Sequence, residues 1–200
     1  LFQVYEHSGW HHSYDTLTRH YRMHEEIASL ITDYYKGRLI PALDSQNQEL
    51  QDSLPSLPDK RVLWIDFPIS ALDYYDPLQI KALSFLIKGW NDSQKLGNLS
   101  TGIGIVAPYR AMIYALRNEL GEPFEDLTCD TVERFQGSER DIILYCIPIR
   151  YPHNIIHLQA LTDNGEVDRK LNVAISRAKS RLIILGNIEA CSKAPHYKHM

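Results

Sequence analysis

Short apolar runs alternate with amphipathic segments along most of the chain, and this alternation constrains the fold more than any other feature. The apolar runs are six to nine residues long and lie at 61–67, 102–107, 141–149 and 181–186. Runs of this length are typical of buried strands. Because strands that alternate with helices indicate βαβ units, the sequence predicts an α/β fold with a mostly parallel sheet. Such sheets bind ligands near the carboxyl ends of their strands.

Helical periodicity fills the segments between these runs. Apolar residues recur every three or four positions in 22–35, in 77–95, from Pro108 to about residue 120, and in 170–180. In the second of these helices we expect the apolar stripe to be buried, and it comprises Leu78, Ala82, Phe85, Leu86 and Trp90.

Length and composition indicate an ordinary globular chain. Its 200 residues suffice for one large domain, which we expect to span 1–200, with polar loops at 44–60 and 151–168. No C-x-x-C pair occurs, and an odd number of cysteines argues against a disulfide framework; these are Cys129, Cys146 and Cys191. There is neither a signal peptide nor an apolar run of membrane-spanning length, so an intracellular, cytoplasmic location without membrane partners is predicted.

The net charge of −4 excludes a uniformly basic protein that coats nucleic acid, but the charge is unevenly distributed. Residues 169–193 contain one acidic residue, Glu189, against six basic ones. The six are Arg169, Lys170, Arg177, Lys179, Arg181 and Lys193. A basic stretch therefore lies near the end of an acidic chain.

Two common patterns do not carry a function here. Gly102, Gly104 and Ala107 match G-x-G-x-x-A, but that dinucleotide fingerprint must follow a strand, whereas these glycines begin one. Several histidines cluster near the start of the chain, yet no H-E-x-x-H or complete ligand set accompanies them, so we predict no metal site. They are His11, His12, His20 and His24. A phosphate loop of the form G-x-x-x-x-G-K-[ST] is also absent.

Four motifs together are far more specific than these glycine and histidine patterns. They read HYRMH at 20–24, PYR at 108–110, TVERFQGSERD at 131–141 and LNVAISRAK at 171–179. In this order they resemble superfamily 1 DNA/RNA helicases, in particular the group that contains the nonsense-mediated-decay RNA helicase and senataxin. The resemblance is to the second, C-terminal RecA-like domain and covers nearly the whole chain. It implies a three-layer RecA-like fold of the P-loop NTPase type.

The resemblance implies an ATP site. Tyr21 would stack on the adenine, and Arg22 would reach the γ-phosphate. Glu139 would contact the ribose or help to order the nucleotide site. Arg177 would be the arginine finger, the cation that stabilises the phosphoryl group during transfer.

It also implies nucleic-acid contacts. Gln136 and Gly137 would shape the loop that couples ATP to single-stranded DNA or RNA. The residues expected along the nucleic-acid backbone are Pro108, Tyr109, Arg110 and Thr131. Two departures from the family pattern are His20, where Gln is usual, and Glu133, where Asp is often found.

The same resemblance implies that the chain is one part of a larger motor. The phosphate loop and the acidic Mg²⁺-binding motif belong to the preceding RecA-like domain, so ATP and Mg²⁺ would be held mainly by that domain. Leu1 and Phe2 resemble a segment that follows it, and the chain lacks a starting Met. We therefore expect ATP-dependent helicase activity in the full-length protein and inactivity of this piece alone. The alternative is a non-catalytic RecA-like module that binds nucleic acid or protein, but intact Arg22, Glu139 and Arg177 argue against it.

Overall fold

Five parallel strands form the central sheet. The computed structural model describes residues 8–9, 18–70, 72–94, 96–198 and 200. The strands follow the order β3-β7-β6-β4-β5, and every neighbouring pair in the sheet is parallel. They are β3 (Val62–Asp66), β4 (Ile103–Val106), β5 (Thr128–Asp130), β6 (Arg140–Ile147) and β7 (Ala178–Gly186). The predicted α/β fold with a parallel sheet is confirmed.

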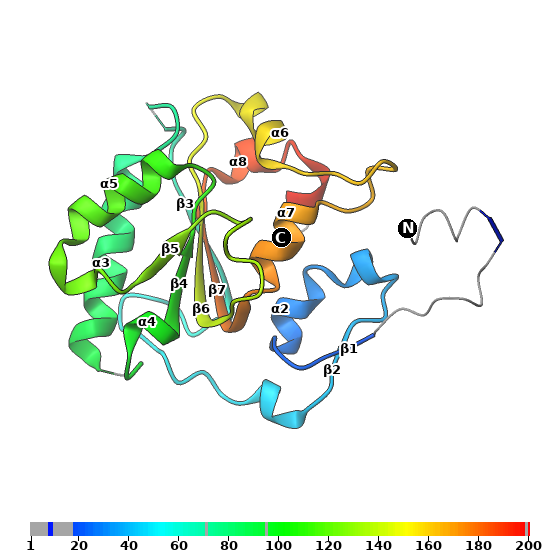
Figure 1. Ribbon diagram of the computed structural model, residues 1–200, viewed down its shortest axis with the longest axis horizontal. Coiled ribbons are helices and arrows are strands. Elements are labelled where there is room, and N and C mark those ends of the chain that lie inside the picture. Colours follow the sequence, from blue (N-terminus) through cyan, green and yellow to red (C-terminus); the bar gives the residue numbers. More distant parts are fainter. Residues whose placement is uncertain (1–7, 10–17, 71, 95, 199) are drawn as a thin grey trace.

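Helices cover both faces of the sheet (Figure 1). One face packs against α3 (Pro77–Ser93), α4 (Leu99–Gly102) and α5 (Arg110–Leu120). The other packs against α2 (Glu25–Ser29), α6 (Ile155–Leu158), α7 (Arg169–Ile175) and α8 (Ile188–Cys191). The molecule therefore has the three layers expected of a RecA-like domain.

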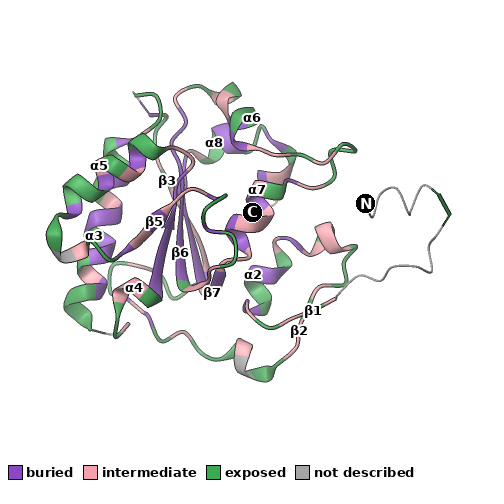
Figure 2. Cartoon of the chain, viewed as in Figure 1, coloured by how far each residue is buried: buried purple, intermediate pink, exposed green. Residues whose placement is uncertain are grey.

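The central strands are apolar on both faces, as a doubly covered parallel sheet requires. In β6, Ile143, Tyr145 and Ile147 face the α2/α7 layer. The intervening Ile142, Leu144 and Cys146 face the α3/α5 layer, because successive side chains of a strand point to opposite faces. Figure 2 shows the buried strands between helices whose outer surfaces are exposed.

The first predicted helix is shorter than its periodicity indicated. Instead of one helix over 22–35, the chain forms α2 and then the 3₁₀ turn η1 (Thr32–Tyr35). The helix begins late because His24 is its N-cap, with its ring Nδ1 accepting a hydrogen bond from the Glu26 amide at 3.1 Å. Before it, β1 (Arg19–His20) pairs with β2 (Ile40–Pro41) in a separate two-stranded sheet. Gly37 follows η1 with a positive φ of 69°.

The last predicted helix also ends early. Helix α7 stops at Ile175, and 178–180 belong to strand β7, not to the 170–180 helix that the pattern predicted. The Arg140 amide donates to the Arg177 carbonyl at 3.0 Å, so pairing with the neighbouring strand outweighs helical propensity here. The three-residue strand β5 was not predicted, because its sequence, TCD, has too few apolar residues to form a recognisable run.

Helix α3 begins at the predicted residue 77, ends at Ser93 instead of 95, and buries a different face. Leu78 and Phe85 are 50% and 64% exposed, which contradicts the predicted stripe. Leu86 and Trp90 are buried as predicted, and the remaining apolar contacts come from Ile80, Leu83 and Ile87. Two overlapping apolar series run along this helix, and the position of the sheet decides which one is buried.

The two predicted loops are largely irregular but not featureless. The 44–60 segment contains the 3₁₀ turn η2 (Asp44–Asn47) and buries Leu54 against the α3/α5 layer. The 151–168 segment contains η4 (Pro152–Asn154) and α6. Two further 3₁₀ turns are η3 (Glu122–Phe124) and η5 (Pro195–Tyr197).

Within the described parts of the chain, no helix is long and apolar enough to cross a membrane. The three cysteines are buried and free, so none takes part in a disulfide.

Gly104 serves packing, which accounts for part of the glycine pattern at 102–107. A Cβ at this position would lie 2.7 Å from Phe135 Cζ and 2.8 Å from Arg140 Cγ, closer than van der Waals contact allows. We expect Gly104→Ala to destabilise the fold by about 1–3 kcal/mol through overpacking. Gly89→Ala in α3 is the matched control, because its nearest neighbour, Leu54 Cδ1, would be 3.6 Å away. That change should be neutral or stabilising by up to about 1 kcal/mol. Equal midpoints for both variants in urea denaturation would contradict the packing role.

Candidate functional site

Three predicted site residues meet at the amino edge of the sheet. Glu139 and Arg177 directly precede β6 and β7, which are adjacent and parallel. The segment that carries Arg22 reaches the same edge because the His24 amide donates to the Lys179 carbonyl at 2.8 Å. Residues far apart in the sequence are therefore brought together.

Glu139 lies between two cations. Its Oε2 accepts a hydrogen bond from Arg22 Nε at 2.7 Å, and its Oε1 lies 3.0 Å from Lys179 Nζ. These two bonds, with Arg22 the stronger influence, lower the pKa of the Glu139 carboxyl, which is therefore ionised near neutral pH. Arg22 Nη1 also donates to the Ser176 carbonyl at 2.9 Å. Glu139 thus fixes the orientation of the Arg22 guanidinium.

Arg177 is held by backbone carbonyls. Its Nη1 donates to the Ser138 carbonyl at 3.3 Å and its Nε to the Val173 carbonyl at 3.2 Å. Burial, followed by repulsion from Arg22, lowers the pKa of Arg177. An anion placed beside these two arginines would relieve that repulsion, so the arrangement favours a phosphate group.

An open pocket lies beside this cluster, and Tyr21 forms part of its wall with 72% of its surface exposed. Arg22, Glu139 and Arg177 line the same pocket. His20, also in the wall, makes a 3.1 Å hydrogen bond between its Nδ1 and Gln46 Nε2. Burial and then Arg22 lower the pKa of His20, so the ring stays neutral near pH 7. The pocket offers an exposed aromatic face next to two cations.

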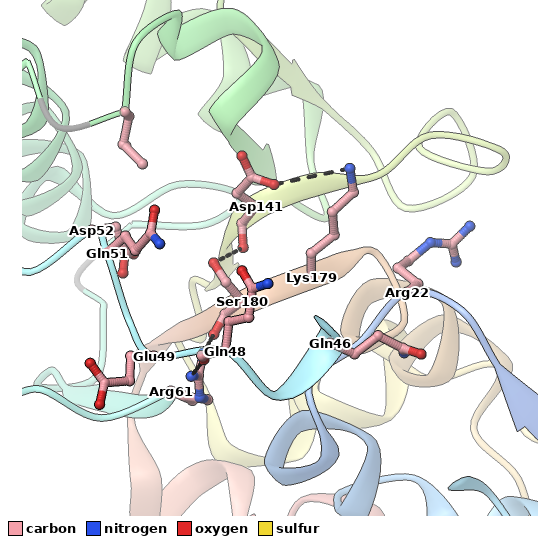
Figure 3. Close-up of a pocket in the computed structure, with 11 residues that line it drawn as sticks. Arg22, Gln46, Gln48, Glu49, Gln51, Asp52, Arg61, Asp141, Lys179 and Ser180 are labelled. Atoms are coloured by element: carbon pink, nitrogen blue, oxygen red, sulfur yellow. Dashed lines mark hydrogen bonds and ion pairs between the residues drawn. The ribbon is translucent and has the colours of Figure 1, made fainter. Parts of the chain in front are cut away.

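A second pocket is also lined by Arg22, together with Lys179, Asp141 and other residues (Figure 3). Lys179 Nζ lies 4.0 Å from an Asp141 carboxylate oxygen, and Ser180 Oγ donates to the Asp141 carbonyl at 2.9 Å. Arg61 donates to the carbonyls of Ser180 and Gln48, which attaches the 44–60 segment to β7. Sequence reasoning did not single out Lys179 as a site residue, although it is the last residue of the LNVAISRAK motif.

Four further predicted residues lie at the opposite, carboxyl edge. Strands β4 and β5 end together, with Val106 beside Asp130, and the Ala107 amide donates to the Asp130 carbonyl at 3.1 Å. The residues that follow these strand ends are Pro108, Tyr109, Arg110 and Thr131. Tyr109 is partly buried, whereas Arg110 is exposed at the start of α5.

One segment, 131–139, runs from the carboxyl edge to the amino edge. Val132 and Phe135 anchor it in the core, while Gln136 and Gly137 are exposed. Gly137 has a φ of +82°, a conformation that favours glycine, and the turn is closed by a 3.1 Å bond from the Ser138 amide to the Phe135 carbonyl. The Ser138 carbonyl in turn accepts from Arg177. This segment physically connects the two edges.

The expectation that the site chemistry lies at the carboxyl ends of the strands is therefore only partly correct. The PYR segment and Thr131 are there, but Arg22, Glu139 and Arg177 are at the amino ends. The reason is local: FQGSE and ISR precede strands rather than follow them.

Metal ligands do not gather at either edge of the described structure. Among the described residues, no group of three or more His, Cys, Asp or Glu side chains is placed to hold a metal ion. His20 and His24 instead make the hydrogen bonds given above, and His11 and His12 lie outside the described residues. The donor set at the amino edge fits the phosphates of a nucleotide, whereas it offers Mg²⁺ little.

The parallel sheet with helices on both faces, and an arginine pair held at its amino edge, define a RecA-like α/β domain. A family model described as "AAA domain" matches residues 1–189, and the chain belongs to this family. The resemblance to superfamily 1 helicases is confirmed by similarity to curated helicases.

Three relatives illustrate this similarity. A probable helicase of Dictyostelium discoideum is 38% identical over 98 residues, which is 48% of this chain and 9% of that protein. The regulator of nonsense transcripts 1 of the same organism is 28% identical, covering 92% of this chain and 14% of the relative. Helicase sen1 of Schizosaccharomyces pombe is 27% identical, and the match covers 86% of this chain and 11% of that protein. The chain thus spans a small fraction, 9% to 14%, of the length of these relatives.

Proposed function

We propose that the chain is the second, C-terminal RecA-like motor domain of an ATP-dependent DNA or RNA helicase or translocase. One observation carries this proposal: Arg22, Glu139 and Arg177 converge at the amino edge, beside the exposed ring of Tyr21. A domain that only binds nucleic acid or protein has no need for two oriented arginines next to a base-sized aromatic surface.

The amino edge is suited to the terminal phosphate of ATP. Phosphoryl transfer gathers negative charge on the transferred group, and placed cations stabilise that charge. Arg22, held by Glu139, would contact the γ-phosphate, while Arg177 would act as the arginine finger. Tyr21 would stack on the adenine. Glu139 would serve mainly to orient Arg22 and would order the nucleotide site through it.

The rest of the ATP site would come from a preceding RecA-like domain in the full-length protein. That domain would supply the phosphate loop and the carboxylates that hold Mg²⁺, which polarises and neutralises the phosphates. Closure of the two domains would bring Arg22 and Arg177 to the nucleotide, so the complete site would form only in the closed arrangement. The amino edge would then be the face that contacts the partner domain.

The carboxyl edge would contact single-stranded nucleic acid through Pro108, Tyr109, Arg110 and Thr131. Arg110 offers a charge for phosphate, whereas the others shape the path of the strand. Segment 131–139 would couple the edges, since Ser138 touches Arg177 at one end and Thr131 lies at the other. Gln136 and Gly137 occupy its turn. Nucleotide-dependent movement of Arg177 would thereby reach the nucleic-acid contacts.

The Tyr21→Ala variant of the full-length protein tests this assignment. Loss of adenine stacking, worth about 1–3 kcal/mol on comparable aromatic surfaces, should raise the KM for ATP about 5- to 150-fold with a smaller effect on kcat. The measurement is steady-state ATP hydrolysis with saturating single-stranded DNA or RNA. Tyr21→Phe keeps the ring and is the matched control, so it should stay close to wild type.

Two results would contradict the proposal. An effect of Tyr21→Ala confined to strand unwinding, with an unchanged KM for ATP, would exclude the adenine contact. Absence of any ATP hydrolysis by the full-length wild-type protein, with either type of strand present, would overturn the motor assignment itself.

A further inference from the structure

An aromatic group lies at the carboxyl edge and includes two exposed tyrosines outside the four motifs, Tyr74 and Tyr151. Tyr74, in the 67–76 loop after β3, packs edge-to-face on Tyr109 with ring centroids 5.2 Å apart and an interplanar angle of 86°. Burial and the neighbouring Tyr74 raise the pKa of Tyr109, which agrees with its enclosed position. Tyr74 itself is 60% exposed. Tyr109 therefore holds a ring that is largely open to solvent.

The backbone at Tyr74 is strained. Its φ is +70°, a left-handed conformation that is unfavourable for a large side chain. Such strain persists only where the surroundings fix it, and it is concentrated at functional sites. Here Ser70 fixes the loop, because its one hydroxyl hydrogen is shared between the Leu72 and Tyr75 carbonyls, 3.0 and 3.1 Å from Oγ, and its Oγ accepts from the Leu72 amide at 3.2 Å. The strained turn presents an aromatic ring instead of a small polar residue.

The segment after β6 presents a second exposed ring beside this loop. Tyr151 is 45% exposed, stacks on His153 with an interplanar angle of 9°, and has the Arg150 guanidinium 5.1 Å from its ring centroid. Arg150 Nη1 donates to Asp73 Oδ2 at 2.7 Å, and the Ser70 amide donates to the Ile149 carbonyl at 2.8 Å. These two bonds attach the Tyr74 loop to the Tyr151 segment.

We propose that Tyr74 and Tyr151 are base-stacking positions for a single strand of DNA or RNA that passes over the PYR segment. This inference rests on the proposed function, since it extends the nucleic-acid contacts of the carboxyl edge from β4 across to the ends of β3 and β6. Exposed aromatic faces bind bases regardless of sequence, because every base has a π-face. At Tyr151, where His153 already stacks on the ring, a base would take the place of the imidazole. A translocating protein requires that tolerance.

The charges near the two rings indicate stacking rather than phosphate binding. Arg150 is paired with Asp73, so its positive charge is largely neutralised. Binding through Tyr74 and Tyr151 should therefore depend little on salt. Arg110 is exposed and has no ion pair among the residues that the structure describes, so it can bind a phosphate and should contribute to the salt dependence. Ring and charge contributions can thus be separated experimentally.

The test uses the full-length protein and labelled oligo(dT) and oligo(U) strands, with affinity measured by fluorescence anisotropy over a range of salt concentrations. We expect Tyr74→Ala and Tyr151→Ala each to weaken binding about 5- to 150-fold without changing the salt slope. Tyr74→Phe and Tyr151→Phe should bind as wild type. Tyr114→Ala is the matched control, because Tyr114 is 70% exposed on α5 and lies outside the aromatic group.

A second readout separates stacking from loss of structure. The fluorescence of 2-aminopurine in a strand is quenched when this base stacks on an aromatic ring. Binding of the wild-type protein should therefore change the fluorescence of the strand, and binding of the alanine variants should change it less. Affinities of Tyr74→Ala and Tyr151→Ala equal to that of Tyr114→Ala, while Arg110→Ala weakens binding, would overturn this inference alone. Absence of strand binding by wild type would overturn the proposed function and this inference with it.

Discussion

In the full-length protein, Arg177→Ala is expected to lower kcat for ATP hydrolysis by about 10³- to 10⁵-fold, while ATP binding largely survives. The large decrease in kcat is expected because negative charge accumulates on the γ-phosphoryl group during transfer. An arginine finger stabilises this transition state far more than it stabilises the bound ATP. Arg177 is anchored through the Val173 and Ser138 carbonyls and lies beside Arg22 in the same pocket. Single-turnover hydrolysis and equilibrium binding of a nucleotide analogue measure the two quantities separately.

Two further variants complete this experiment. Arg177→Lys keeps the positive charge but loses the planar fork of donors, so its kcat should also fall well below wild type. Arg117→Ala is the control, because Arg117 lies on α5, where its Nη1 donates to the Glu125 carbonyl at 3.5 Å, and it is not among the residues that line the pocket of Arg177. It should hydrolyse ATP as wild type does. An unchanged kcat in both Arg177 variants would remove this residue from the finger role.

Asp52→Ala is expected to have the largest effect on stability, about 3–5 kcal/mol of unfolding free energy. The Arg181 side chain is fully buried, and its Nε lies 3.4 Å from the Oδ2 of Asp52, whose side chain is 4% exposed. Burial raises the pKa of Asp52 although Arg181 opposes this shift, so desolvation outweighs the attraction between them. Removing Asp52 leaves a buried guanidinium whose other carboxylate contact, Asp59 at 3.8 Å, is mostly exposed.

Matched variants distinguish an unpaired charge from a simple loss of contacts. Asp73→Ala breaks an exposed ion pair with Arg150 and should cost less than about 1 kcal/mol. The double variant Asp52→Leu with Arg181→Met removes both charges and should recover most of the lost stability, because an apolar pair needs no desolvation. Urea denaturation measures all three. If the double variant is as unstable as Asp52→Ala, the buried charge is not the cause.

Much of the fold could be predicted from the sequence because the apolar runs are local signals. Strand β3 was predicted at 61–67 and spans Val62–Asp66, and β4 was predicted at 102–107 and spans Ile103–Val106. The errors arise where a tertiary contact overrides a local pattern. Lys179 was assigned to a helix but pairs within β7, and the buried face of α3 is set by the sheet beneath it.

The candidate site shows the same division. The motifs alone indicated which residues to examine, and each of those that mark the nucleotide edge lies in one pocket. The motifs do not indicate Lys179 as a partner of Glu139, and they do not indicate Tyr74 or Tyr151 as site residues. No spacing rule indicates them, since Tyr74 becomes prominent only through a positive φ and its contact with Tyr109.

By itself, the sequence determined that the long strands of the central sheet alternate with helices, and it determined the family to which the chain is similar. Only the tertiary structure decided that the predicted residues divide between two opposite edges of the sheet. The strand order β3-β7-β6-β4-β5 comes from pairings between segments far apart in the chain, and local periodicity does not encode such pairings. Arg22 and Glu139 are 117 positions apart, yet they share a hydrogen bond because two parallel strands begin side by side.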